Sequence, residues 1–182
     1  MRGKSHICLG QYLSDRYLTD VPRRYVRAFL IGCVEPDRNP ATYLKGSLRC
    51  QWLRGHNYQN ARRFMRRISL RLEQKEKFRL FDYYTLGKLI HYTADAFTYA
   101  HNSRFPTDLG EHRQYEADLQ NHFLAYMSED PQVDIPAARS VTEAICRFHR
   151  EYSEVPGNIR RDARFSLAAC CCVLAVLLVN PL

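Results

Sequence analysis

The sequence predicts an all-α protein, and three observations lead to this prediction. Apolar residues recur at helical spacing, glycine and proline fall mainly between these periodic segments, and strand-like alternation is hard to find. With 182 residues, 46% of them apolar, the chain can bury one hydrophobic core. We therefore predict a single-domain multi-helix bundle over residues 1–182.

The first two helices are predicted from residues that favour helix starts and ends. Ser5 is expected to cap a first helix that runs to about Leu18. Pro22 opens a second helix, which is expected to end near Gly32 or Cys33.

A long connection is predicted from about residue 34 to 57, and it contains Asp37, Trp52 and His56. Connections of this length in a compact domain usually carry function. It is therefore the first place to look for residues of a site.

The third helix, about 58–73, is strongly amphipathic. Its inner face is predicted to consist of apolar side chains, and its outer face of arginines. The apolar positions are Ala61, Phe64, Met65, Ile68 and Leu72, and the arginines are Arg62, Arg63, Arg66, Arg67 and Arg71. A solvated basic face is the simpler interpretation of these arginines, and a phosphate-binding surface is the alternative.

The C-terminal half is predicted to contain four more helices. Asp82 caps a fourth that continues through Tyr99, and residues 104–110 form a loop. A fifth helix is expected at about 111–127, a sixth at about 137–152 and the last from about Arg160.

The last helix raises the question of core or membrane anchor, because residues 165–182 contain no charged residue and include Cys170, Cys171 and Cys172. About 15 residues of this run are strongly apolar, or roughly 22 Å of helix, against the roughly 30 Å thickness of a bilayer's hydrocarbon core. We predict a buried core helix, and an anchor or interfacial helix is the alternative.

Net charge and cysteine content indicate which classes of partner and which cellular compartment to expect. The formal net charge of +8 favours anionic partners: phosphate, nucleic acid or an acidic membrane surface. Seven cysteines without a CxxC pair fit neither a disulfide framework nor a zinc ribbon. Because no secretory signal is readable at the N-terminus, a cytoplasmic protein, with membrane association left open, is the working expectation.

Five metal-ligand side chains lie within 26 residues, at spacings that indicate a metal site. His91 and Asp95 are four residues apart, which places both on one helix face, and His112 and Glu116 repeat that spacing. His101 lies on another side of the helix from Asp95, so it fits a second ion better. Imidazole and carboxylate ligands without thiolate are typical of catalytic zinc, which activates water for hydrolysis.

The complete pattern is His91, three residues, Asp95, five residues and His101, followed by His112, three residues and Glu116. This pattern resembles the zinc-dependent phospholipase C family of bacterial enzymes. Single-strand-specific zinc nucleases are related to that family in fold and site. The resemblance covers most of the chain, because the family is all-α and draws further ligands from an early His, an Asp in the second quarter of the chain and a His that starts a helix.

The resemblance implies a cluster of two or three Zn²⁺ ions. The implied ligands are Asp37, His56 and His91 for one zinc, His101, His112 and Glu116 for a second, and His6 for a third, with Asp95 bridging the first and third. The two remaining histidines, His122 and His149, are interpreted as ordinary helix residues.

The chain departs from the family pattern at two positions. The family ligates its third zinc partly through an N-terminal Trp, whereas this chain begins Met1-Arg2, whose amino group can still fold back onto the site. Tyr99 stands where the family usually has proline, so the fourth helix is expected to run on a little further.

The implied chemistry is attack on a phosphodiester by a zinc-activated hydroxide, with Asp37 orienting or deprotonating the nucleophile. Three functions stay open. The first is a phospholipase C-like hydrolase, whose lipid would meet apolar side chains from the set Phe29, Leu44, Trp52, Tyr58 and Phe105. The second is a nuclease that tracks single-stranded nucleic acid with the arginine-rich third helix. The third is a non-catalytic zinc protein that acts as a scaffold or at a membrane surface.

Overall fold

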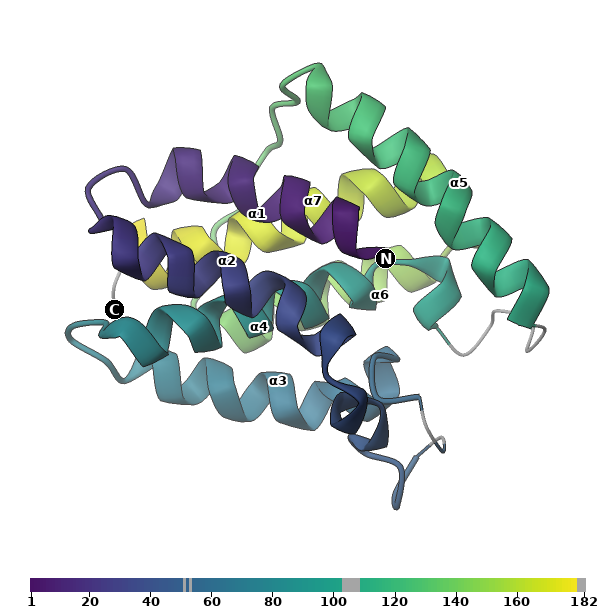
Figure 1. The fold of residues 1–182 in the computed structure, drawn as a ribbon, viewed down its shortest axis with the longest axis horizontal. Helices are drawn as coiled ribbons and strands as arrows, with labels where there is room; N and C mark the ends of the chain where they lie inside the picture. Colours follow the sequence, from purple (N-terminus) through teal and green to yellow (C-terminus); the bar gives the residue numbers. More distant parts are fainter. Residues whose placement is uncertain (51, 53, 103–108, 180–182) are drawn as a thin grey trace.

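The computed structural model describes residues 1–50, 52, 54–102 and 109–179, and these residues contain α-helices and short helical turns but no strand. The all-α prediction is therefore confirmed (Figure 1). The helices are α1 (Gly3–Tyr17), α2 (Arg23–Arg38), α3 (Tyr58–Glu73), α4 (Leu80–Ala96), α5 (Leu109–Ser128), α6 (Val141–Ser153) and α7 (Ile159–Leu174). Two 3₁₀ turns, η1 (Pro40–Leu44) and η2 (Tyr99–His101), and a π-helical turn, η3 (Ala175–Val179), complete them.

Helix α4 lies at the centre of the bundle, in contact with α1, α2, α3 and α7 (Figure 1). Thirteen of its 17 residues are buried, which is the pattern of a helix surrounded by other helices. The two ligands predicted on this helix, His91 and Asp95, are consequently buried.

Two glycines allow α2 and α4 to pack with their backbones almost touching. A Cβ atom at Gly32 would lie 2.1 Å from the carbonyl oxygen of Tyr84, and one at Gly87 would lie 2.1 Å from that of Phe29. Any side chain at either position would push the helices apart. This crossing brings the end of α2 beside the second half of α4.

The predicted end of the second helix, at Gly32 or Cys33, is wrong, because α2 continues to Arg38 and places Asp37 on the helix instead of in a connection. Gly32 serves helix packing and does not terminate the helix. The last turn closes through a hydrogen bond from the Asn39 N–H to the Glu35 carbonyl, 3.0 Å, and Glu35 also pairs with Lys88 at 2.7 Å. The connection predicted at 34–57 is therefore shorter and contains η1.

Three predicted caps or ends are also corrected. Ser5 does not cap α1, which begins at Gly3 and buries Ser5 inside the helix. Asp82 lies in the first turn of α4, where its carboxylate accepts the Arg79 N–H at 3.0 Å, so Arg79 is the capping position. Helix α4 ends at Ala96 and does not reach Tyr99, since the Asp95 carbonyl accepts both the N–H and the hydroxyl of Thr98.

The later helices are shifted by a few residues from their predicted bounds. Helix α6 begins at Val141 and not near residue 137, because the Ser140 hydroxyl caps it by accepting the Glu143 N–H at 3.1 Å. Residues 104–108 of the predicted loop lie outside the described residues, and Gly110 belongs to α5. Helix α3 has the predicted bounds, with its apolar face buried or half-buried and its arginines exposed.

The core is formed by apolar side chains from all seven helices, and α7 contributes Cys170, Cys171 and Cys172, each at most 2% exposed. The prediction that this last helix is part of the core is therefore confirmed for its described residues. Among those residues, none of the helices combines the length and the apolar character needed to cross a membrane.

Candidate metal centre

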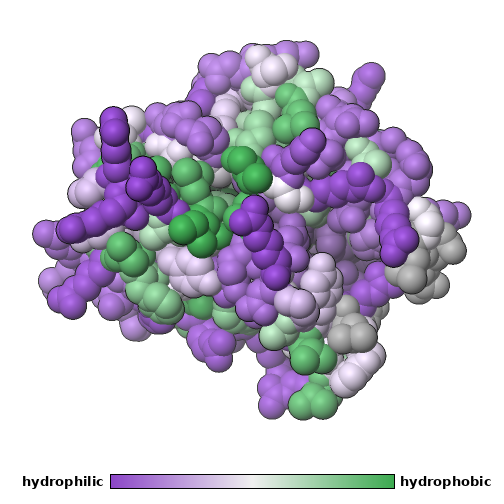
Figure 2. Space-filling model, in the orientation of Figure 1, coloured by the Kyte–Doolittle hydropathy of each residue, from purple (hydrophilic) through white to green (hydrophobic). Residues whose placement is uncertain are grey.

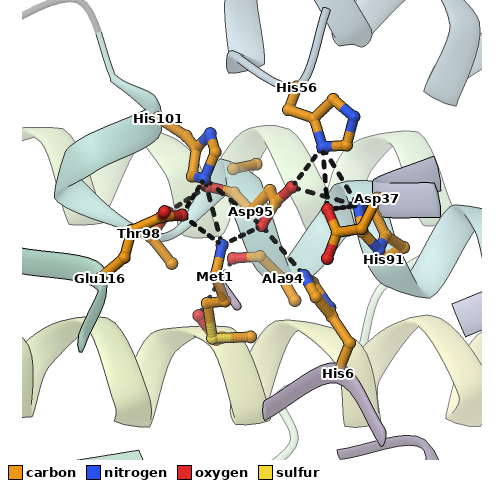
Figure 3. Close-up of polar contacts among 12 residues, drawn as sticks. Met1, His6, Asp37, His56, His91, Ala94, Asp95, Thr98, His101 and Glu116 are labelled. Carbon is orange, nitrogen blue, oxygen red and sulfur yellow. Dashed lines mark hydrogen bonds and ion pairs between the residues drawn. The ribbon is translucent and has the colours of Figure 1, made fainter. Parts of the chain in front are cut away.

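The eight predicted ligands converge at one end of α4, and all of them except His112 are labelled in Figure 3. They form three groups whose candidate ligand atoms lie within 4.8 Å of one another. These groups are Asp37, His56 and His91; His101, His112 and Glu116; and His6, His91 and Asp95. The ligands come from α1, α2, the residues before α3, α4, η2 and α5, so the site depends on how these elements pack together.

The first group joins α2, α4 and the residues before α3. His56 Nδ1 lies 3.2 Å from His91 Nε2, and Asp37 Oδ1 lies 3.6 Å from each of these atoms. The opposite nitrogens of both rings are held by oxygens: His91 Nδ1 donates to the Cys33 carbonyl at 2.9 Å, and His56 Nε2 donates to the Thr42 hydroxyl at 3.1 Å. The remaining lone pairs of both imidazoles therefore face the group, as in zinc sites.

The second group lies between η2 and α5. His101 Nε2 is 3.2 Å from Glu116 Oε1, and His112 Nε2 is 3.6 Å from Glu116 Oε2. Burial alone would raise the pKa of Glu116, but hydrogen bonds from the two histidines and the nearby Met1 ammonium outweigh it and hold that pKa far below its usual range. Glu116 is therefore an anion at neutral pH, as a metal ligand must be.

Asp95 connects the groups, because its two oxygens face different partners (Figure 3). Oδ2 lies 3.1 Å from His56 Nδ1 and 3.3 Å from His91 Nε2, whereas Oδ1 lies 3.2 Å from His6 Nε2. Burial would raise the pKa of Asp95, but the surrounding histidines and the Met1 ammonium lower it well below the usual value. A carboxylate placed in this way can hold two cations at once.

His6 enters the site from α1 and stacks on the His91 ring, with centroids 3.9 Å apart. Burial lowers the pKa of His6 to about 4, so the ring is neutral at pH 7. Within the described residues, neither ring nitrogen of His6 makes a hydrogen bond, although Nε2 faces the Asp95 carboxylate. A buried neutral imidazole beside a carboxylate is a donor set that a metal cation satisfies.

The amino group of Met1 folds back into the same space. The ammonium nitrogen lies 2.5 Å from Asp95 Oδ1, 3.1 Å from His101 Nε2 and 3.5 Å from Glu116 Oε1. Burial would lower its pKa, but the carboxylates of Asp95, Glu116 and Asp37 outweigh this and raise it to about 10. A positive charge is therefore already accommodated where the ligand groups meet.

These residues fit zinc. Their donors are nitrogen and oxygen atoms in groups of three, the ligand number that leaves a coordination position open for water. The seven cysteines are free, and none of them belongs to a ligand group of the described residues.

Comparison with protein families agrees with this chemistry. The sequence model of the family described as zinc dependent phospholipase C matches residues 5–162, a span that contains all eight predicted ligands. The chain belongs to the zinc-dependent phospholipase C family. Searches of curated proteins and of solved structures gave no significant match.

In this zinc-dependent phospholipase C family member, residues that hold the ligands in position are harder to recognise from sequence than the ligands themselves. Asp162 on α7 is buried and accepts hydrogen bonds from the Tyr152 and Tyr115 hydroxyls, 2.7 and 2.8 Å, and from the Tyr99 N–H, 2.7 Å. Tyr99 begins the turn that carries His101, and Tyr115 precedes Glu116. Asp162 therefore anchors both elements of the second group, and a lone acidic residue in the first turn of an apolar helix is the only sequence signal for it.

The same contact explains the departure at Tyr99. Proline has no N–H, so it could not donate to Asp162 as Tyr99 does. The expectation that the fourth helix would run on further without proline is wrong, because the chain leaves α4 at Ala96 and makes the turn η2.

Replacing Asp162 with asparagine should change how stability depends on pH. Burial raises the pKa of Asp162 from 3.8 to about 6, although three hydrogen bonds oppose the shift. The folded state therefore favours the protonated acid, whose stabilisation is present below the unfolded pKa and is lost as the pH rises through about 6. The quantity to compare is the unfolding free energy of the wild type minus that of Asp162→Asn. We expect this difference to fall by about 3 kcal/mol as the pH rises from below 3.8 to above about 6.

The measurement is urea unfolding of both chelator-treated proteins at a series of pH values. Effects of other groups are common to the two proteins and cancel in the difference. A difference that stays constant across this range would contradict the assignment.

Proposed function

We propose that the protein is a zinc-dependent, phospholipase C-like hydrolase that cleaves phospholipid or a related phosphodiester. The observation that carries the proposal is the set of three ligand groups joined through Asp95, in a chain of the zinc-dependent phospholipase C family. Five of the ligands line a pocket of about 420 Å³, large enough for a phosphodiester and its flanking groups: Asp37, His56, His101, His112 and Glu116.

Charged residues of this pocket suit an anionic substrate. Arg54 and Arg113 line it beside His56, His101 and His112, and provide positive charge for the phosphate. Zinc, when bound, would supply a nucleophilic water at neutral pH and neutralise charge on the phosphodiester. The full set of ligands would be His6, Asp37, His56, His91, Asp95, His101, His112 and Glu116.

Asp37 is the candidate for a catalytic role in addition to a ligand role. Its side chain is 25% exposed and lines the pocket, whereas Asp95 is fully buried and Glu116 is 18% exposed. Asp37 is thus the carboxylate best placed to orient a water or accept its proton.

A nuclease is the second candidate, favoured by a separate groove. Arg62, Arg63 and Arg66 line a groove of about 330 Å³ between α3 and α6, and among the described residues no carboxylate pairs with these three arginines. Binding of single-stranded nucleic acid there should weaken steeply as salt increases, whereas hydrolysis of zwitterionic lipid should not.

The test is elemental analysis of the purified protein, followed by turnover of lipid, nucleic-acid and small phosphodiester substrates with zinc present. We expect two or three zinc equivalents and hydrolysis of phospholipid. His91→Ala and Glu116→Ala should each abolish activity, whereas His122→Ala should not, because His122 is half-buried on α5 and belongs to none of the ligand groups.

His149 is a poorer control than His122, since its ring stacks on Tyr58 with centroids 3.6 Å apart and its replacement would disturb packing. Fewer than two zinc equivalents would contradict the cluster. Zinc binding without turnover of any substrate would instead support the non-catalytic alternative.

A further inference from the structure

Exposed apolar side chains gather on the segment between α2 and α3. Among the described residues, eleven large hydrophobic side chains are exposed, and four of them lie within ten residues of each other. They are Tyr43, Leu44, Leu48 and Trp52, with exposed fractions of 41, 51, 95 and 65%. We call these four residues the apolar loop. It projects from the lower edge of the molecule, where Figure 2 shows hydrophobic side chains at the surface.

The backbone beneath the apolar loop is held in place. Gly46 has φ +72°, and a Cβ there would lie 2.8 Å from the Asn60 carbonyl oxygen. The Asn60 amide donates to the Lys45 carbonyl at 3.0 Å, and the Gly55 N–H donates to the Tyr43 carbonyl, also at 3.0 Å. Leu48 is therefore exposed on a turn that is hydrogen-bonded to α3. Burial of the Leu48 side chain would be favourable, so its exposure indicates an interaction surface.

The charged residues of the segment that carries the apolar loop all have one sign. Residues 39–57 contain Lys45, Arg49 and Arg54 but no Asp or Glu. Arg49 is exposed one residue after Leu48, whereas the Lys45 ammonium lies over the Phe64 ring, 3.9 Å from its centroid. Apolar and aromatic tips flanked by arginine match the boundary between acyl chains and anionic headgroups.

The apolar loop borders the metal centre. The Tyr43 ring stacks on His56 with centroids 4.7 Å apart, and Tyr43 and Arg54 line the same pocket as the ligands His56 and Asp37. A surface bound by this loop would therefore lie beside the opening of the pocket.

We propose that the apolar loop docks the protein on bilayers that contain anionic glycerophospholipids, by inserting Leu48 and Trp52 at the interface. The inference rests on the proposed function in one respect: the bilayer supplies the phospholipid that the protein hydrolyses. Docking itself needs no hydrolysis. Insertion turns the pocket toward the headgroups, so that a lipid phosphodiester can reach the ligands without leaving the membrane.

The unmodified protein carries its own reporter, because Trp52 is its only tryptophan. Adding vesicles of equimolar phosphatidylcholine and phosphatidylglycerol should shift the tryptophan emission to the blue, and brominated acyl chains should quench it. Pure phosphatidylcholine vesicles should give a weaker response. Binding to the mixed vesicles without blue shift or quenching would overturn the proposal, as would a blue shift produced by single-stranded nucleic acid but not by vesicles.

The matched variants are Leu48→Asp and Leu80→Asp. Leu48 is almost fully exposed, so its replacement should leave the fold intact, and Leu80 is 48% exposed at the start of α4, at the opposite end of the molecule (Figure 1). In co-sedimentation with the mixed vesicles, Leu48→Asp should bind at least about tenfold more weakly than the wild type, the factor expected for losing one buried leucine. Leu80→Asp should bind as the wild type does. Equal binding of both variants would overturn the proposal.

Activity separates this proposal from the proposed function. Leu48→Asp should hydrolyse a water-soluble phosphodiester at the wild-type rate but phospholipid in mixed vesicles at least about tenfold more slowly. If no substrate is hydrolysed while Trp52 still responds to vesicles, the proposed function fails and docking stands. If both proteins hydrolyse vesicle lipid equally, docking fails and the proposed function stands.

Discussion

Replacing Asp95 with asparagine should remove at least one zinc equivalent and slow phosphodiester hydrolysis by about a thousandfold, or about 4 kcal/mol in the activation free energy. The substitution keeps the volume of the side chain but removes the negative charge that its two oxygens share between ligand groups. Oδ1 faces His6 and the Met1 ammonium, and Oδ2 faces His56 and His91. An asparagine oxygen could hold a cation on one side only, and its NH₂ group would repel a cation on the other.

The same variant should be less stable than the wild type even after chelation. The Met1 ammonium is buried, and its closest contact is Asp95. Removing the carboxylate leaves this charge without its main partner, a change that typically costs a few kcal/mol. Urea unfolding and elemental analysis of the same preparation measure both effects.

The control for this variant is Asp118→Asn. Asp118 is exposed on α5, and its carboxylate accepts a surface hydrogen bond from Gln114, 3.0 Å long, which is its one hydrogen bond within the part of the chain that the structure describes. It should keep the zinc content, activity and stability of the wild type. Full zinc content and turnover in Asp95→Asn would show that Asp95 does not join the groups.

Replacing Gly87 with alanine should destabilise the fold by about 3 kcal/mol or more, although alanine is the better helix former. The added methyl group would lie 2.1 Å from the Phe29 carbonyl oxygen and 2.8 Å from the Cys33 backbone nitrogen, both on α2. Backbone atoms cannot rotate away as a side chain can, so α2 and α4 must separate. Thermal or urea unfolding measures the loss.

The displacement should also reach the metal centre. His91 lies one turn after Gly87 and donates to the Cys33 carbonyl, and Asp37 lies at the end of α2. Moving the helices apart therefore separates two ligands of the first group, and zinc content should fall with stability.

Gly10→Ala is the matched control, since Gly10 is also a helical glycine. The atoms nearest to a Cβ there would be side-chain atoms of Leu30 and Cys33, at 3.2 to 3.4 Å, and small shifts of these side chains would accommodate it. We expect its stability to lie within about 1 kcal/mol of the wild type. An equal loss in the two variants would show that the close approach of α2 and α4 is not what Gly87 provides.

The ligands on α4 and α5 could be predicted from sequence because their relation is local. His91 and Asp95 share one helix, as do His112 and Glu116, so the helical repeat alone places each pair on one face. The helical repeat also predicts that His101, six residues after Asp95, belongs to a different ion from His91 and Asp95. The structure places His101 beside Glu116. The burial of the C-terminal helix could also be predicted, since its strongly apolar run of about 15 residues is shorter than the hydrocarbon core of a bilayer.

Positions that depend on neighbouring helices were predicted less well. Gly32 and the prolines beyond it predict a helix end, but the role of Gly32 is to let α2 contact α4. Asp162 could not be assigned, because its three hydrogen bonds come from three distant elements. The apolar residues proposed as lipid contacts also separate only in the structure: Phe29 is core, Tyr58 is half-buried, Phe105 lies outside the described residues, and Leu44 and Trp52 are exposed.

By itself, the sequence determined the helical class and the five candidate ligands between His91 and Glu116, since these follow from residue types and local spacing. The family resemblance that this pattern carries added His6, Asp37 and His56. Only the tertiary structure decided how closely these side chains approach one another, which partner each Asp95 oxygen faces and that the Met1 ammonium contacts Asp95. The physical reason is that distances across a bundle depend on how closely its helices pack. Here, two missing Cβ atoms on α2 and α4 determine that distance.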